Sequence, residues 1–234
     1  SQLLPVIGKG QMPVVTKFMK LIGKDPVVLA DADAFTDDMD LAHCFLANSP
    51  IADANASKLG APSAIKLASS TFSDFCSLVN DNWGDISKQA ETHPYCVNAE
   101  ESVDEKVKRR AVFCTLMSLS SSEVNDLSNT EKWSSMKDRL TVVLRLLEDL
   151  GCFILRKGAV ESYYQASDIY TSEGKPTAAV DEIDYLDQLS AEEIKEKLND
   201  LVRCIEHASG GERIDEAESL RDILLSIAAP AAAR

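Results

Sequence analysis

The sequence has few histidines and few basic residues, and it lacks any long apolar run. Three histidines stand far apart among 234 residues, which leaves little material for a serine-histidine-aspartate triad or an imidazole-rich metal site. The 24 basic residues are outnumbered by 38 acidic ones, and the net charge of −14 argues against a broad basic surface for nucleic-acid backbones. No stretch reaches the roughly 18 apolar residues of a membrane span, and no signal peptide is recognisable. We therefore expect a soluble, cytoplasmic protein with no membrane partner, whose chemistry would rest on carboxylates.

Apolar residues are nevertheless numerous enough for a folded core. They make up 45% of the sequence, which suffices for one large domain or two small ones. The six cysteines are scattered, without a Cys-x-x-Cys pair or a histidine at zinc spacing. This pattern indicates buried free thiols and not a disulfide or zinc framework.

Two short apolar runs predict neighbouring strands of a parallel sheet. Residues 26–30 are apolar throughout, which is typical of a strand covered on both faces by helices. Residues 12–22 precede this run with apolar side chains at helical spacing and end at a glycine, so they predict an amphipathic helix. A second run, residues 152–155, follows a predicted helix over 137–150. These elements predict an α/β fold.

The chain divides into four segments by composition. Residues 1–45 and 137–176 hold the two parts of the sheet core, and residues 46–136 show only helical patterns and form a helical insertion. Within the insertion, residues 90–102 are expected to be a loop. Residues 177–234 form a helical C-terminal segment with a solvated acidic face, and this segment carries more than half of the net negative charge.

Carboxylates gather directly after the first predicted strand. Asp31 and Asp33 follow it at once, and Asp37, Asp38 and Asp40 come next. Ligand sites in open α/β sheets lie at this end of the strands, and two carboxylates so close repel unless a cation shares them. Magnesium or manganese is the cation that such oxygen ligands favour. The alternative is that these residues only begin the next helix, which fits Asp38 and Asp40 best.

The second predicted strand ends in a related way. Lys157 and Glu161 follow it, and Glu161 would stand at the neighbouring strand end, within reach of Asp31 and Asp33. The alternatives are that Glu161 is a first-turn helix residue and that Lys157 is a solvated loop lysine. Their place beside a second buried strand favours a functional role.

Three segments carry a family resemblance: residues 8–11, 27–34 and 153–161, which read GKGQ, VVLADADA and FILRKGAVE. Together they resemble the Toprim nuclease domain of ATP-dependent nucleases of the OLD (overcoming lysogenization defect) family. The resemblance covers about residues 5–45 and 150–176, and it rests on the order of the three segments because Asp-x-Asp alone is shared with unrelated enzymes.

The resemblance implies a metal-dependent DNA endonuclease with a Toprim-like parallel sheet. Asp31 and Asp33 resemble the Asp-x-Asp metal ligands, Glu161 resembles the later acidic ligand, and Asp37 is an auxiliary ligand. In the family, two Mg²⁺ or Mn²⁺ ions support hydrolysis of a DNA phosphodiester, which is two-metal displacement chemistry.

The resemblance also implies a catalytic lysine and a larger parent protein. A fixed positive charge is most effective near the transition state, and Lys175 and Lys157 are the two candidates, between which the sequence does not choose. The chain starts after the point where the glutamate-bearing first Toprim strand would lie, and it contains no Gly-x-x-x-x-Gly-Lys-Ser/Thr loop. We therefore expect a C-terminal region whose parent carries an N-terminal ATPase domain, and the oligomeric state stays open.

Two other functions fit parts of the sequence. A phosphatase of the haloacid dehalogenase type also places Asp-x-Asp after a buried strand, but its motif wants Thr or Val two positions after the second aspartate, and here Ala34 and Phe35 follow. A non-enzymatic alternative is an acidic helical interaction module in which Asp31 and Asp33 are merely solvated. Metal binding would argue against that module.

A group of basic residues stands out in the helical insertion. Its members are Lys106, Lys108, Arg109 and Arg110. Such groups are usually solvated helix faces, but in a nuclease this one would help to seat DNA.

Overall fold

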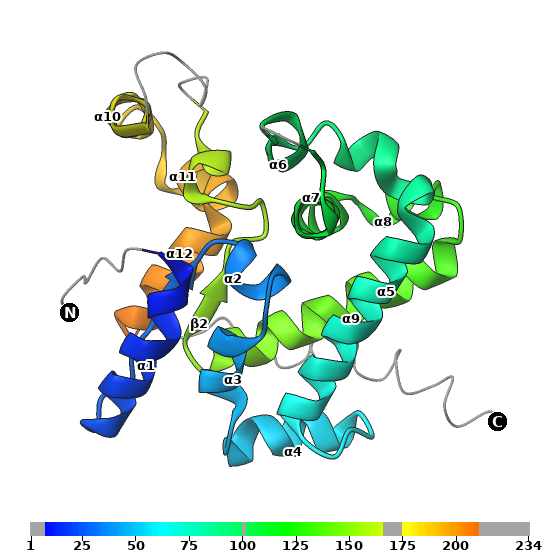
Figure 1. Cartoon of the computed structure of the whole chain (residues 1–234). Coiled ribbons are helices and arrows are strands. Elements are labelled where there is room, and N and C mark those ends of the chain that lie inside the picture. Colours follow the sequence, from blue (N-terminus) through cyan, green and yellow to red (C-terminus); the bar gives the residue numbers. More distant parts are fainter. Residues whose placement is uncertain (1–7, 100–101, 166–174, 211–234) are drawn as a thin grey trace.

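A short pair of parallel strands surrounded by helices lies at the centre of the structure, a computed structural model that describes residues 8–99, 102–165 and 175–210 (Figure 1). In chain order the elements are η1 (Lys9–Gln11), α1 (Met12–Leu21), β1 (Val28–Ala30), α2 (Asp33–Thr36), α3 (Asp40–Leu46), α4 (Pro50–Lys58), α5 (Ala64–Ala90), α6 (Pro94–Val97), α7 (Glu105–Ser118), α8 (Ser121–Asn125), α9 (Thr130–Asp149), β2 (Cys152–Ile154), η2 (Val160–Tyr163), α10 (Lys175–Leu186), α11 (Ala191–Lys197) and α12 (Asn199–Ala208). The fold is mostly helical, with one small parallel sheet.

The strand pair confirms the parallel pairing expected from the sequence. Val28 lies opposite Cys152 and Ala30 opposite Ile154. Beyond the strands, the amide of Ala32 donates a hydrogen bond of 2.7 Å to the carbonyl of Gly158, so the two chain segments stay joined where they leave the sheet. β2 is buried throughout, whereas the first two residues of β1 are only half-buried. The covering of β1 is therefore less complete than its apolar sequence predicts.

The helices between the strands pack around one aromatic centre. Phe35, on α2 directly after the exit of β1, is fully buried, and its ring lies 6.3 Å from Phe72 of α5 and 5.8 Å from Phe113 of α7. Burying rings of this size supplies much of the apolar stabilisation of a core. Phe35 thus fixes the helical segment to the end of the strand that bears Asp31 and Asp33.

The C-terminal helix α12 packs onto the strands. It contacts both β1 and β2, and the ring of His207 meets the ring of Phe153 edge-on at 5.5 Å. Cys204 and Asp200 on this helix are buried. The solvated acidic face predicted for residues 177–234 is present on α11, whose acidic residues are exposed, but Asp200 of α12 is an exception because it is paired inside the protein.

That carboxylate belongs to an ion network between α9, the exit of β2 and α12. Asp200 accepts hydrogen bonds from the guanidinium of Arg203 at 2.7 Å, from Arg156 and from the hydroxyl of Tyr163. Glu148 accepts from Arg156 at 2.9 Å and from Arg203 at 2.6 Å. Each buried carboxylate thus faces both arginines, the arrangement that compensates for the loss of hydration of buried charges.

Helix α1 forms where the sequence predicts it, but its apolar stripe is not turned to the core. Pro13 and Thr16 are its buried residues, whereas Phe18 and Ile22, which the helical spacing places on the apolar side, are exposed. The neighbours of α1 are chiefly α3 and η1.

The six cysteines are free, as the sequence predicts, and four of them are buried. Burial raises the pKa of Cys114 and Cys152 far above the ordinary range, so these thiols are neutral core residues. Of the helices in the described ranges, none combines the length and the apolar character that crossing a bilayer requires.

Candidate functional site

The two leading carboxylates lie where β1 turns into α2. Asp31 is exposed, and Asp33, the first residue of α2, is half-buried. Between them Ala32 is fully buried, and its carbonyl accepts a hydrogen bond of 3.1 Å from the Thr36 hydroxyl. The amide of Ala34 donates to the carbonyl of Asp31 at 3.0 Å. This tight, anchored turn places both carboxylates at the carboxyl end of β1, as the sequence predicts.

The segment that follows β2 runs beside this turn, and a glycine allows it to approach closely. Gly158 has φ of +117°, and a Cβ there would lie 3.2 Å from the Tyr95 ring and 3.4 Å from His93. A side chain at this position would meet both a strained backbone and a close aromatic neighbour. Gly158 therefore allows the β2 exit to pack against α6 while its carbonyl binds Ala32.

His93 and Tyr95, at the start of helix α6, pack beside the segment that follows β2. The sequence did not reveal this helix, since residues 90–102 were expected to be only a loop. The rings of His93 and Tyr95 stack with centroids 5.2 Å apart. His93 Nδ1 accepts from the Tyr95 amide, and Nε2 lies 3.3 Å from the carbonyl of Lys157. A ring that accepts at Nδ1 donates from Nε2, so the two contacts assign the neutral Nε2-protonated form. The sequence signal for this helix was the pair His93-Pro94, because proline is favoured at the first position of a helix.

The ring of His93 predicts a pH-dependent stability. Burial lowers its pKa below the ordinary value of 6.5, in spite of the hydrogen bond with Lys157. The unfolded chain therefore binds more protons than the folded chain as the pH falls through 6.5, and the contribution of His93 to stability is lost there. We expect urea unfolding at about pH 7.5 and about pH 5.5 to show a smaller difference for His93→Gln than for the parent chain. Equal differences would contradict this role.

An ion pair joins the helical segment to the strand exit. The guanidinium of Arg110 on α7 binds the carboxylate of Asp37 through two hydrogen bonds of 2.8 and 2.5 Å, and the Asp37 side chain is only 3% exposed. Arg110 also lies over the Tyr95 ring, 5.8 Å from its centroid. The carboxylate of Asp37, a predicted auxiliary metal ligand, and the guanidinium of Arg110, a predicted DNA-binding group, are thus engaged with each other in this structure.

The phenol of Tyr95 lies in the electrostatic field of the two carboxylates. Burial raises the pKa of Tyr95, and the negative charges of Asp33 and Asp31 raise it further, while Arg110 opposes them. The phenol therefore remains protonated at any physiological pH. The surroundings of Asp31 and Asp33 are accordingly anionic, with Arg110 as a nearby positive charge.

The predicted ligands are not gathered into a complete metal site. In the ranges that the structure describes, no three His, Cys, Asp or Glu side chains stand close enough together to hold an ion. Asp31, Asp33 and Glu161 therefore do not form the three-carboxylate group that the sequence predicted, and Glu161 lies in η2, half-buried. Asp31 and Asp33 remain as a pair of neighbouring carboxylates.

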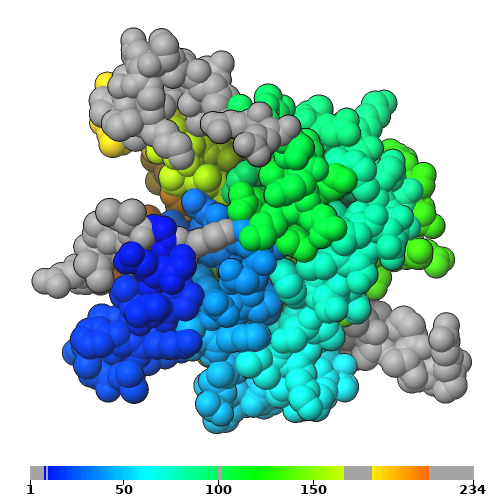
Figure 2. Space-filling model, in the orientation of Figure 1, coloured from blue at the N-terminus to red at the C-terminus, as the bar shows by residue number. Residues whose placement is uncertain are grey.

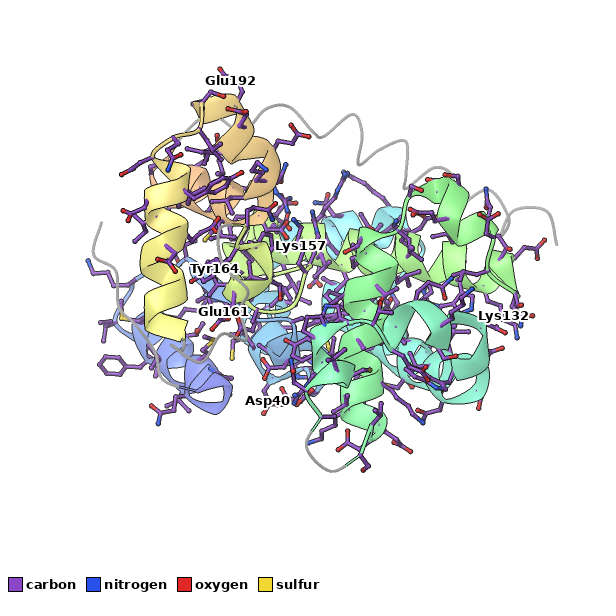
Figure 3. All side chains as sticks on the ribbon, turned by 90° about the horizontal axis from the view of Figure 1, so that it is seen from above. Asp40, Lys132, Lys157, Glu161, Tyr164 and Glu192 are labelled. Atoms are coloured by element: carbon purple, nitrogen blue, oxygen red, sulfur yellow. The ribbon has the colours of Figure 1, made fainter. Side chains whose placement is uncertain are left out.

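Neither of the two predicted lysines is placed against those carboxylates by a described contact. Lys157 extends toward the C-terminal helices: its ammonium lies over the Tyr163 ring at 4.8 Å and 3.5 Å from the carbonyl of Lys197. Figure 3 shows Lys157 and Glu161 on the segment after β2, far from Lys132 at the other end of the molecule. Lys175 is the first residue of α10, and its side chain lies outside the described part.

The members of the predicted DNA-binding group on α7 make different contacts. Lys108 lies over the Trp83 ring at 5.3 Å, Arg109 donates to the sulfur of Cys76 at 3.7 Å, and Lys106 is exposed. Lys106, Arg109 and Arg110 stand at positions i, i+3 and i+4 and therefore share one side of α7, whereas Lys108 lies on the opposite side. The DNA-binding role of this group stays a prediction.

Comparison with known proteins adds no relative to this picture. No protein-family model, curated protein or solved structure matches the chain. Functional inference therefore depends on the residues described above.

Proposed function

We propose that the chain is the Toprim-like region of an OLD-family nuclease, which binds Mg²⁺ or Mn²⁺ and cleaves DNA phosphodiester bonds. The supporting observation is the placement of Asp31 and Asp33 at the carboxyl end of β1, with the exit of the parallel strand β2 hydrogen-bonded beside them. Ligand sites of parallel sheets lie at this edge. Mostly helical surroundings are compatible with a small α/β core that carries a helical insertion.

A single magnesium ion fits the two carboxylates better than a two-ion cluster does. Magnesium keeps several waters and is commonly held by one or two carboxylates together with a substrate phosphate. Asp31 and Asp33 meet that requirement without Glu161 or Asp37. When bound, such an ion neutralises phosphate charge and lowers the pKa of a coordinated water.

Other residues near the two carboxylates hold them in place. Arg110 and Asp37 fix α7 against the end of α2, and Gly158 lets the β2 exit bind the buried Ala32 between the two carboxylates. A site held by rigid elements loses less entropy when a ligand binds. We also propose that Lys175 or Lys157 serves as the catalytic lysine. The parent protein would carry an ATPase domain, and the substrate would be DNA.

The proposal predicts that metal binding and cleavage depend on both strand-end carboxylates. We expect calorimetry to show Mg²⁺ or Mn²⁺ binding by the parent chain and none by Asp31→Asn/Asp33→Asn, because a magnesium site needs its anionic oxygens. Nicking of supercoiled plasmid should fall by at least about a hundredfold, as is typical when a metal site loses its ligands.

The matched control removes two carboxylates elsewhere. Asp81→Asn/Glu131→Gln changes the net charge by the same amount at two exposed positions on α5 and α9. This control should bind metal and nick DNA like the parent chain. Metal binding that survives in the Asp31/Asp33 variant, or absence of binding in the parent chain, would overturn the proposal.

A further inference from the structure

The outer face of α1 is an apolar stripe on the surface of the molecule. Four large apolar side chains form it, with exposed fractions between 53% and 85%: Val14, Phe18, Leu21 and Ile22. Residues at i, i+4, i+7 and i+8 share one side of a helix, so the four are contiguous. Figure 2 shows α1, in dark blue, projecting at the surface. A contiguous apolar patch of this kind marks an interaction surface.

Positive charge flanks the stripe. Lys17 and Lys24 are exposed, and the ammonium of Lys20 is held against α3 by a hydrogen bond of 2.7 Å to the carbonyl of Cys44. The helix itself contains no acidic residue. An occupant must therefore be apolar on one side and acidic beside it. The α1 stripe of a second copy is a poor occupant, because a symmetric contact sets lysines against lysines.

The end of α12 lies near the segment that follows α1. A Cβ on Gly151 would lie 3.4 Å from the His207 ring and 3.4 Å from the carbonyl of Pro26, so these two residues border the same point. His207 stands just before the end of α12, and Pro26 lies a few residues beyond α1. The described part of the chain thus ends at Gly210, three residues beyond a point that borders the segment following α1.

The sequence of that following segment complements the stripe. Leu220, Ile223, Leu224 and Ile227 have the i, i+3, i+4, i+7 spacing of an amphipathic helix. Acidic residues outnumber basic ones over residues 212–222. This combination of an apolar stripe and negative charge matches what α1 presents.

We propose that residues 212–228 of the same chain dock on the α1 stripe, with their apolar side on Phe18 and Leu21 and their acidic residues near Lys17 and Lys24. Burial of the apolar stripe on both partners drives the contact, and the charges set its orientation. This assignment is independent of the proposed nuclease function.

Hydrogen exchange measured by mass spectrometry on the full chain tests the docking from both sides. In the parent chain, amides of residues 212–228 should be protected. Phe18→Gln/Leu21→Gln should raise their exchange rates by about tenfold or more, because loss of docking opens them to solvent. Leu220→Gln/Leu224→Gln should in turn raise exchange in α1. Ile51→Gln, a change at another exposed apolar residue on α4, should alter neither segment.

Three results would overturn the assignment. The first is exchange of residues 212–228 at the unprotected rate in the parent chain. The second is protection that the α1 variant leaves intact, which would place the segment elsewhere. The third is protection that rises with protein concentration together with a doubled mass in sedimentation, which would make the occupant the segment of a second copy.

Discussion

Asp200→Asn is expected to lower the free energy of unfolding by about 3 kcal/mol, because removal of one partner from a buried ion network leaves the others uncompensated. Asp200 accepts hydrogen bonds from Arg156, Arg203 and Tyr163, and its side chain is only 9% exposed. The asparagine keeps the shape but removes the charge that faces two arginines. Urea unfolding followed by circular dichroism measures the change.

The control for this prediction lies on the same helix. Glu206 pairs with Lys195 at 3.0 Å, and both side chains are about half exposed. Exposed pairs of this kind contribute about 0 to 1 kcal/mol, so Glu206→Gln should leave stability nearly unchanged. Similar losses in both variants would mean that the network does not hold α12 to the strands.

The second large effect is expected at the ion pair between α7 and α2. Arg110→Met should cost about 3 kcal/mol, because it leaves the buried carboxylate of Asp37 without its partner. Asp37→Asn/Arg110→Met should cost less than the sum of the two single changes, since the double variant leaves no buried charge behind. Thermal and urea unfolding of the parent chain and the three variants provide the cycle.

This cycle also separates a structural role for Arg110 from the DNA-binding role that the sequence suggested. Lys106→Gln, on the exposed part of the same helix, should change stability by less than about 0.5 kcal/mol. Strict additivity of the Asp37 and Arg110 changes would contradict the pairing. A DNA affinity that fell in Arg110→Met at unchanged stability would return Arg110 to a binding role.

Local patterns in the sequence predicted the local structure well. The helix predicted over residues 137–150 is present as the second part of α9, which begins earlier, at Thr130. In the C-terminal segment, predicted to be helical, Ser190 forms a capping box with Glu193 at the start of α11. The carboxyl end of β1 bears Asp31 and Asp33, as its apolar run implied. These features depend on residues a few positions apart, which a single sequence displays directly.

Contacts between distant segments could not be read in this way. A carboxylate that is solvated and one that is paired inside the protein look the same in sequence, so Asp37 was assigned to a metal and Asp200 to a solvated face. Their arginine partners belong to other elements of the fold. The spacing of Phe18 and Ile22 predicted an apolar stripe correctly, but a spacing does not say which neighbour covers the stripe.

The pairing of β1 with β2 has a kinetic consequence. The two strands are separated by most of the described chain, and each is three residues long. So small a pair cannot hold itself together, and closing so long a loop costs entropy before any contact repays it. We therefore expect the helices from α3 to α9 to assemble first and to bring the strand ends together. We therefore also expect the edge that bears Asp31 and Asp33 to form late, and during synthesis only after β2 has left the ribosome.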